Sequence, residues 1–122
     1  MGGAIIWDKE QPLLNRSSCE IASVSKTKIV HKYTQTWTNY VNEKETTHPT
    51  EKPVKLFVWI INKFTEKNEL VLDPFMGSGT TAVACEQLQR KWIGIEISEA
   101  YCSIIKNRLS KWKGQQRLEF VF

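Results

Sequence analysis

The stretch that decides the fold of this chain is DPFMGSGTT, residues 73–81. It follows the apolar run 70–72 and precedes a segment that reads as a helix. An acid, a proline and two glycines between a strand and a helix indicate a turn that approaches a ligand closely, because glycine lets the backbone bend tightly and come near a bound molecule. The surrounding residues must therefore identify that ligand.

The residues on both sides of this turn predict alternating helices and strands. Apolar residues from Leu56 to Phe64 recur at spacings of three and four, which indicates one face of a helix that starts near Pro53. Ser98 is suited to cap a later helix. The predicted order is strands at 3–7, 19–24 and 28–33, a helix at 53–64, a buried strand at 69–72, a helix at 80–89, a strand at 92–97, the helix after Ser98 and a strand at 118–122. This rhythm predicts an α/β fold with a parallel sheet covered by helices.

The glycine turn itself narrows the choice of ligand. Residues 77–82 match the G-x-G-x-x-G/A pattern of dinucleotide-binding folds, and Glu96 at the end of the next predicted strand is placed to accept hydrogen bonds from ribose hydroxyls. Asp73 argues against a nicotinamide cofactor, because a carboxylate before the turn would oppose the pyrophosphate. It favours a cationic ligand such as S-adenosyl-L-methionine, with its sulfonium and α-ammonium groups. A glycine turn that only packs a helix on a strand is the plainer alternative.

Composition sets broad limits on the class of protein. The 122 residues predict one domain, and the net charge of +4 fits either a polyanionic partner or a lysine-rich surface. The three cysteines form neither a CxxC pair nor a metal-ligand cluster, which predicts a reducing, cytoplasmic setting and no metal site. Because no run approaches ~18 apolar residues, no membrane span is expected.

Residues 73–109 resemble the cofactor-binding half of DNA amino-methyltransferases, which methylate adenine N6 or cytosine N4. HPTEKP at 48–53 resembles their second cofactor motif, which in one permuted class lies directly upstream of the glycine motif. Phage-type members of that class are the most similar. The resemblance is strong over 48–109, whereas over 1–33 the chain more weakly resembles the late strands that precede the variable recognition region. It implies a Rossmann-like S-adenosylmethionine-dependent methyltransferase fold.

The resemblance also implies roles for individual residues. In the glycine motif, methionine and turn contacts would come from Asp73, Phe75, Gly77 and Gly79, with hydroxyls and amides from Ser78 and Thr80. Glu96 would hold the ribose and Ile97 would lie against the adenine. The second motif would close the site through His48, Thr50 and Lys52. For His48 and Phe75 a plain structural role, as a loop histidine and a core aromatic, is equally expected.

One motif of this family is absent from the sequence. The catalytic Asp/Asn/Ser-Pro-Pro-Tyr/Phe/Trp motif binds the target amine and stacks on the flipped base. The four prolines, at positions 12, 49, 53 and 74, include no adjacent pair, so no catalytic residue is assigned. In the permuted class this motif lies upstream of everything seen here. We therefore expect an incomplete fold that lacks the catalytic strand and its successor, and whose partner is either a missing N-terminal segment or a second chain.

These observations divide the chain into three regions within one partial methyltransferase domain, 1–122. Residues 1–33 form the late-strand region, 34–47 a variable loop suited to target recognition, and 48–122 the cofactor-binding βαβ region. Double-stranded DNA is the expected partner. Basic side chains mixed with aromatic ones are typical of surfaces that contact a nucleic-acid backbone and stack on its bases. The candidates for this contact are Lys28, Lys32, Trp37, Tyr40 and Lys44, with a solvated lysine-bearing loop as the alternative. An RNA amino-methyltransferase portion and a non-catalytic cofactor- or partner-binding module remain open as alternatives.

Overall fold

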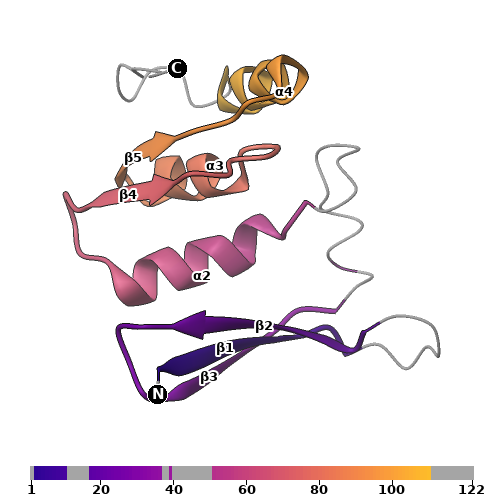
Figure 1. Ribbon diagram of the computed structural model, residues 1–122, viewed down its shortest axis with the longest axis vertical. Helices are drawn as coiled ribbons and strands as arrows, with labels where there is room; N and C mark the ends of the chain where they lie inside the picture. The colour runs from indigo at the N-terminus through magenta and orange to yellow at the C-terminus, as the bar shows by residue number, and fades with distance from the viewer. Residues whose placement is uncertain (1, 11–16, 37–38, 40–50, 111–122) are drawn as a thin grey trace. The chain divides into compact units, whose positions relative to one another are not determined.

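The computed structural model describes residues 2–10, 17–36, 39 and 51–110 of the 122-residue chain (Figure 1). The chain divides into two compact units, Met1–Lys44 and Glu45–Phe122. Each unit contains a sheet of its own. None of the described helices is long and apolar enough to cross a lipid bilayer.

The first unit is a three-stranded mixed sheet. Its strands are β1 (Gly3–Asp8), β2 (Cys19–Val24) and β3 (Val30–Thr34), in the spatial order β2-β1-β3. Strand β1 runs antiparallel to β2 and parallel to β3. Alternate β1 residues are buried, including Ile5 and Trp7, and the Trp7 indole N–H donates a hydrogen bond to the Gln35 carbonyl at 3.1 Å. The three strands predicted from the sequence are thus confirmed, with the third beginning two residues later than expected.

The second unit contains the βαβ arrangement predicted around the glycine turn. In chain order its elements are α2 (Val54–Phe64), β4 (Leu70–Asp73), α3 (Thr80–Gln87), β5 (Lys91–Gly94) and α4 (Glu99–Ser110). Strands β4 and β5 are parallel, and Asp73 is in register with Gly94. The Ser98 hydroxyl accepts a hydrogen bond from the Tyr101 amide at 3.4 Å, which confirms Ser98 as the cap of α4. The strand predicted at 118–122 lies outside the described residues.

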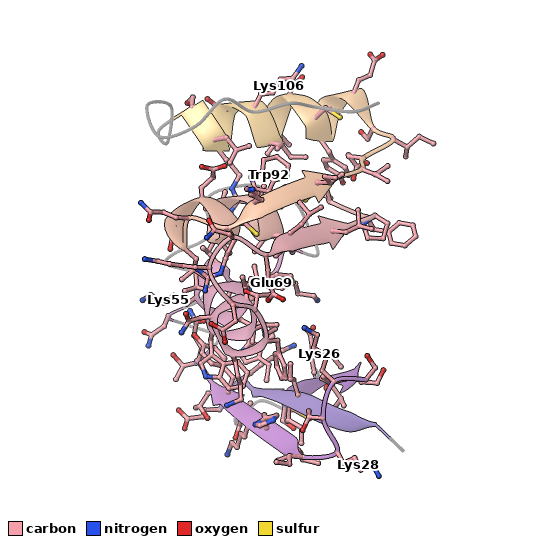
Figure 2. All side chains as sticks on the ribbon, turned by 90° about the vertical axis from the view of Figure 1, so that its left-hand side faces the viewer. Lys26, Lys28, Lys55, Glu69, Trp92 and Lys106 are labelled. Carbon is pink, nitrogen blue, oxygen red and sulfur yellow. The ribbon has the colours of Figure 1, made fainter. Side chains whose placement is uncertain are left out.

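Helix α3 is the centre of this unit's core. Every residue from Thr80 to Cys85 is buried, so this helix has no solvated face over its first six residues. Its Val83 packs with Met76, Ile105 and Leu109, and its Ala84 and Cys85 pack with Ile61 of α2. Trp92 of β5, labelled in Figure 2, packs against both clusters. Burial raises the pKa of the Cys85 thiol to about 12.

One sequence prediction about this sheet is wrong. The strand expected to be buried is covered on one face only, because Val71 packs into the core while Leu72, on the opposite face, is 61% exposed. The two-residue period of a strand places successive side chains on opposite faces, and the helices of this unit pack against one of them. The uncovered side chains form a row that we call the bare face: Leu70, Leu72, Ile93 and Ile95.

Candidate functional site

The carboxyl ends of β4 and β5 carry the acids that the sequence singled out. The backbone pairing continues past both strands, because Ile95 N–H donates to the Asp73 carbonyl at 3.0 Å and Met76 N–H donates to the Ile95 carbonyl at 2.9 Å. The turn after β4 is therefore held against the segment after β5. This places Asp73 and Glu96 at the same edge of the sheet, where open α/β folds bind their ligands.

Asp73 is held by two donors that carry no charge. Its Oδ1 accepts a hydrogen bond from the Phe75 amide at 3.0 Å, and its Oδ2 accepts one from the Thr81 hydroxyl at 2.5 Å. Among the described residues, no lysine, arginine or histidine forms an ion pair with this carboxylate. Within the described part of the chain, this carboxylate is therefore oriented by neutral donors alone. Sequence reasoning missed Thr81, although its place in the first turn of the helix after the glycines was an available signal.

Glu96 holds two backbone segments at once. Its Oε2 accepts a hydrogen bond from the Gly77 amide at 2.7 Å, and its Oε1 accepts one from the Ser98 amide at 2.9 Å. One carboxylate therefore links the glycine turn to the start of α4. An ionised carboxylate offers about four acceptor positions, so Glu96 retains capacity for a ligand's hydroxyl groups.

The glycines of the turn are required by its geometry. Gly79 has a φ of 88°, and a Cβ there would lie 2.8 Å from Cγ1 of Ile105. Gly77 also has a positive φ, of 56°. Such left-handed conformations favour glycine because other residues bring their Cβ into conflict with the backbone. Gly94, which sequence reasoning did not single out, leaves the space that the Met76 side chain occupies.

Ser78 and Thr80 correct an expectation. Their hydroxyls were expected to face the cofactor, but both residues are buried and their hydroxyls are engaged inside the protein. The Thr80 hydroxyl donates to the Lys52 carbonyl at 3.2 Å, and Arg108 Nη1 lies 3.3 Å from Ser78 Oγ. A buried hydroxyl satisfies its hydrogen bonds with neighbouring protein groups, so these side chains support the turn from behind.

Two apolar side chains of the predicted site are strongly exposed. Phe75 is 87% exposed and Ile97 is 98% exposed, one in the turn after β4 and the other in the segment after β5. This exposure overturns the alternative of Phe75 as a core residue. Lys52 is half-buried and contributes its carbonyl to Thr80. Two predicted site residues, His48 and Thr50, lie outside the described part of the chain.

The basic and aromatic residues predicted to contact DNA all belong to the first unit. Lys28 lies at the turn between β2 and β3 and is exposed (Figure 2). Lys32 pairs with Asp8 at 2.7 Å, and this contact raises the pKa of Lys32 and lowers the pKa of Asp8. The other predicted contacts lie outside the described residues: Trp37, Tyr40 and Lys44.

Known proteins share both the sequence and the fold of this chain. Over 79 residues the chain is 43% identical to the type II methyltransferase M2.LlaDCHI of Lactococcus lactis subsp. cremoris, a match that covers 62% of this chain and 29% of that protein. Over 63 residues it is 51% identical to the protein YubD of Escherichia coli K12, covering 52% of this chain and 28% of that protein. The chain thus spans less than a third of the length of these curated relatives.

The structural comparison agrees. A crystal structure of the M1.HpyAVI–SAM complex superposes with a TM-score of 0.60 at 32% identity, covering 87% of this chain and 60% of the other. TTHA0409 of Thermus thermophilus, in complex with S-adenosyl-L-methionine, superposes with a TM-score of 0.66 over 98% of this chain and 56% of the other, and its 22% identity supports the fold alone. The Rossmann-like α/β fold with a partial sheet is therefore confirmed. Because a family model described as DNA methylase matches residues 6–107, this chain belongs to the N6/N4 DNA methylase family.

Proposed function

We propose that this chain binds S-adenosyl-L-methionine at the carboxyl edge of β4 and β5 and forms the cofactor-binding part of a DNA amino-methyltransferase. The transfer would place a methyl group on the exocyclic amine of adenine (N6) or cytosine (N4). The observation that carries the proposal is the Asp73 carboxylate, which two neutral donors orient beside the glycine turn.

The chemistry of the site fits this cofactor. S-adenosyl-L-methionine brings a sulfonium and an α-ammonium group, and the Asp73 carboxylate, which forms no ion pair with the described residues, complements either cation. Glu96 can accept hydrogen bonds from ribose hydroxyls while it keeps the Gly77 and Ser98 amides. Exposed Phe75 offers apolar surface to the methionine part, and exposed Ile97 offers it to the adenine ring. The complex of a relative with the same cofactor supports this reading.

The proposed division of labour follows from these contacts. Asp73 and Phe75 contact the methionine part of the cofactor, Glu96 binds the ribose, and Ile97 contacts the base. Gly77 and Gly79 let the backbone come close, and Ser78 and Thr80 support the turn through their buried hydroxyls. The second motif closes the site, with contacts assigned to His48, Thr50 and Lys52.

When bound, the cofactor would supply an electrophilic methyl group for direct attack by the target amine. The residues of this chain hold and orient the cofactor, and positioning of this kind supplies much of the rate enhancement in a two-reactant transfer. The groups that bind the target base would come from a catalytic Asp/Asn/Ser-Pro-Pro-Tyr/Phe/Trp motif on another segment or a second chain, since no adjacent prolines occur in residues 1–122.

The bare face supports a completing partner. Parallel sheets are almost always covered on both faces, yet Leu70, Leu72, Ile93 and Ile95 are solvent-exposed in the described residues. A row of apolar side chains on a parallel sheet is the surface that the remaining helices of a methyltransferase fold would cover. We therefore expect methyl transfer to require the polypeptide that carries the catalytic motif.

Contact with double-stranded DNA is assigned to basic and aromatic positions of the first unit. Lys28 and Lys32 are exposed and are suited to phosphate contacts, together with Trp37, Tyr40 and Lys44. Each phosphate contact contributes about 0.9 to the slope of log affinity against log salt. Replacing Lys28 and Lys32 by alanine should therefore lower that slope by roughly 2. An unchanged slope would remove these two lysines from the DNA interface.

The decisive test is calorimetric titration of the purified chain with S-adenosyl-L-methionine and, separately, with NAD. We expect saturable binding of S-adenosyl-L-methionine and none of NAD, and we expect Asp73→Ala to abolish the binding. A folded chain that binds neither ligand would refute the proposed cofactor site.

Transfer itself is tested with a radiolabelled methyl group and duplex DNA. The chain alone should incorporate no label, whereas a mixture with the polypeptide that carries the catalytic motif should label adenine or cytosine. Analysis of the digested DNA would then identify the base. Incorporation into RNA in place of DNA would favour the RNA enzyme, and cofactor binding without any transfer in the mixture would favour a non-catalytic module.

A further inference from the structure

A charged pair is buried behind the proposed cofactor site. Arg108 on α4 is 3% exposed and Glu51, in the segment just before α2, is 6% exposed. Their charged groups approach within 3.4 Å, between Arg108 Nη2 and Glu51 Oε1. Ions are costly to remove from water unless they are paired and hydrogen-bonded. Because apolar side chains would fill the same space at lower cost, a buried ion pair in a unit of this size indicates a specific structural role.

The contacts of Arg108 join two segments that are distant in sequence. Its Nη1 donates to the Ser78 carbonyl at 2.9 Å and lies 3.4 Å from the Thr80 hydroxyl oxygen. That hydroxyl in turn donates to the Lys52 carbonyl at 3.2 Å. One guanidinium thus contacts the glycine turn through the hydrogen bonds of Nη1 and the segment before α2 through the ion pair of Nη2 with Glu51.

Both of these segments carry proposed cofactor contacts. Gly77 and Gly79 flank Ser78 in the turn, and Lys52 follows Glu51 directly. Arg108 is buried and lies behind the turn, so its contacts are with the backbone that presents the ligand-binding groups. The planar fork of an arginine can satisfy several acceptors in fixed directions, which a lysine ammonium on a flexible stem does less well.

We propose that Arg108, paired with Glu51, is a positioning residue that fixes the glycine turn relative to the segment before α2, so that the two sides of the cofactor site are assembled before the ligand arrives. This inference rests on the proposed cofactor site. Pre-organisation raises affinity because the ligand does not bear the cost of ordering the site.

The chain provides a matched control in Arg90, which also joins two segments. Its Nε donates to the Thr65 hydroxyl at 3.1 Å and its Nη1 donates to the Leu88 carbonyl at 2.9 Å. These contacts lie beyond the C-terminal end of α3, away from the glycine turn. Arg108→Lys and Arg90→Lys both keep the charge and remove the fork. They therefore separate a general loss of packing from an effect on the site.

The first readout needs no ligand. Amide hydrogen exchange of the full 122-residue chain, measured by NMR, follows Gly77 and Gly79, whose amides are hydrogen-bonded to Glu96 and to the Met76 carbonyl. Arg108→Lys should speed exchange at both amides beyond any change in global stability measured by urea unfolding, and Arg90→Lys should not. If the exchange rates in both variants rise only as much as the loss of global stability predicts, the proposal is overturned.

The second readout is cofactor affinity by calorimetry. Arg108→Lys should weaken binding of S-adenosyl-L-methionine about tenfold, and Arg90→Lys should leave it unchanged. Thr80→Val, which removes the shared hydroxyl at nearly constant volume, should weaken it in the same direction. Equal weakening by Arg108→Lys and Arg90→Lys would overturn the positioning role. If the parent chain binds no cofactor, the cofactor proposal fails, and the exchange measurement still decides whether Arg108 orders the turn.

Discussion

Strands β1 and β4 both end in an aspartate, and comparing the two strand ends separates a local motif from a site. Asp8 Oδ1 accepts the amide of Glu10 at 2.9 Å, just as Asp73 Oδ1 accepts the amide of Phe75 at 3.0 Å. The second oxygen makes the difference. In Asp8 it pairs with Lys32 in solvent, whereas in Asp73 it accepts the hydroxyl of Thr81. Among the described residues, the same turn therefore ends in an ion pair in one unit and in a carboxylate held by neutral donors in the other.

The largest expected effect is the loss of cofactor affinity when the charge of Asp73 is removed. Asp73→Asn keeps the shape of the side chain and removes the charge, so it should weaken binding of S-adenosyl-L-methionine about 100-fold, as the loss of one partner in a desolvated charge pair does. Asp8→Asn is the matched control and should leave affinity unchanged. Calorimetry decides, and a similar loss in both variants would show that the distinction between the two aspartates is mistaken.

The turns after the two aspartates provide the next contrast. Gly79 at φ 88° lies in the turn after β4, and Glu10 at φ 46° lies in the turn after β1. Gly79→Ala should lower the free energy of unfolding by about 1–3 kcal/mol, because alanine resists this backbone conformation. Its Cβ would also press on Ile105. Glu10→Gly should instead leave stability equal or higher. Urea unfolding measures both, and a neutral Gly79→Ala would contradict the geometry of the turn.

Thr81→Val sharpens the comparison at the second oxygen. Valine keeps the volume but removes the hydroxyl that orients Asp73, and hydrogen bonds to charged groups contribute about 1.5–3 kcal/mol. We expect cofactor affinity to fall about tenfold, less than for Asp73→Asn because the charge remains. Serine at this position restores a donor, so Thr81→Ser should recover most of the affinity. Failure of serine to recover it would point to packing of the threonine methyl group.

The smallest effect is expected at the other aspartate. Lys32→Met removes the ammonium that lowers the pKa of Asp8, so the pKa should rise toward its ordinary range. A carboxyl whose pKa is lowered on folding stabilises the protein above its unfolded pKa, and this contribution is lost as pH falls through the folded pKa. Because the pair is solvent-exposed, the change in stability should be slight and should vanish in high salt. NMR titration of the Asp8 carboxyl measures this change in pKa. A midpoint that is the same in Lys32→Met and in the parent chain would show that the ion pair does not form in solution.

Local patterns predicted much of the second unit. The apolar residues that recur at spacings of three and four from Leu56 to Phe64 indicated α2. The acid and glycines around 73–79 indicated the turn, and the predicted cap Ser98 is confirmed. Each of these signals lies within a few residues of the feature it predicts. The family resemblance of residues 48–109 was also available from the sequence, and the match over 6–107 confirms it.

The errors and omissions concern distant partners. The continuous apolar run 70–72 predicted a buried strand and could not show that one face lacks a covering layer, since that depends on helices elsewhere in the chain. The hydroxyls of Ser78 and Thr80 were directed toward a ligand because nothing nearby indicated Arg108, which lies about thirty residues along the chain. A basic residue on an amphipathic helix reads as solvent-exposed, and only packing reveals that this one is buried.

The reactivity of the buried Cys85 thiol can report how often the core of this unit opens. A cysteine reacts as its thiolate, and burial that raises the pKa of Cys85 to about 12 suppresses both the thiolate and access to it. Modification at neutral pH must therefore await an opening of the packing between α2 and α3. With Cys19 and Cys102 replaced by serine, the rate at which a thiol reagent modifies the protein would report how often its core opens. If bound cofactor keeps the packing between α2 and α3 closed for longer, this modification rate should fall as cofactor is added.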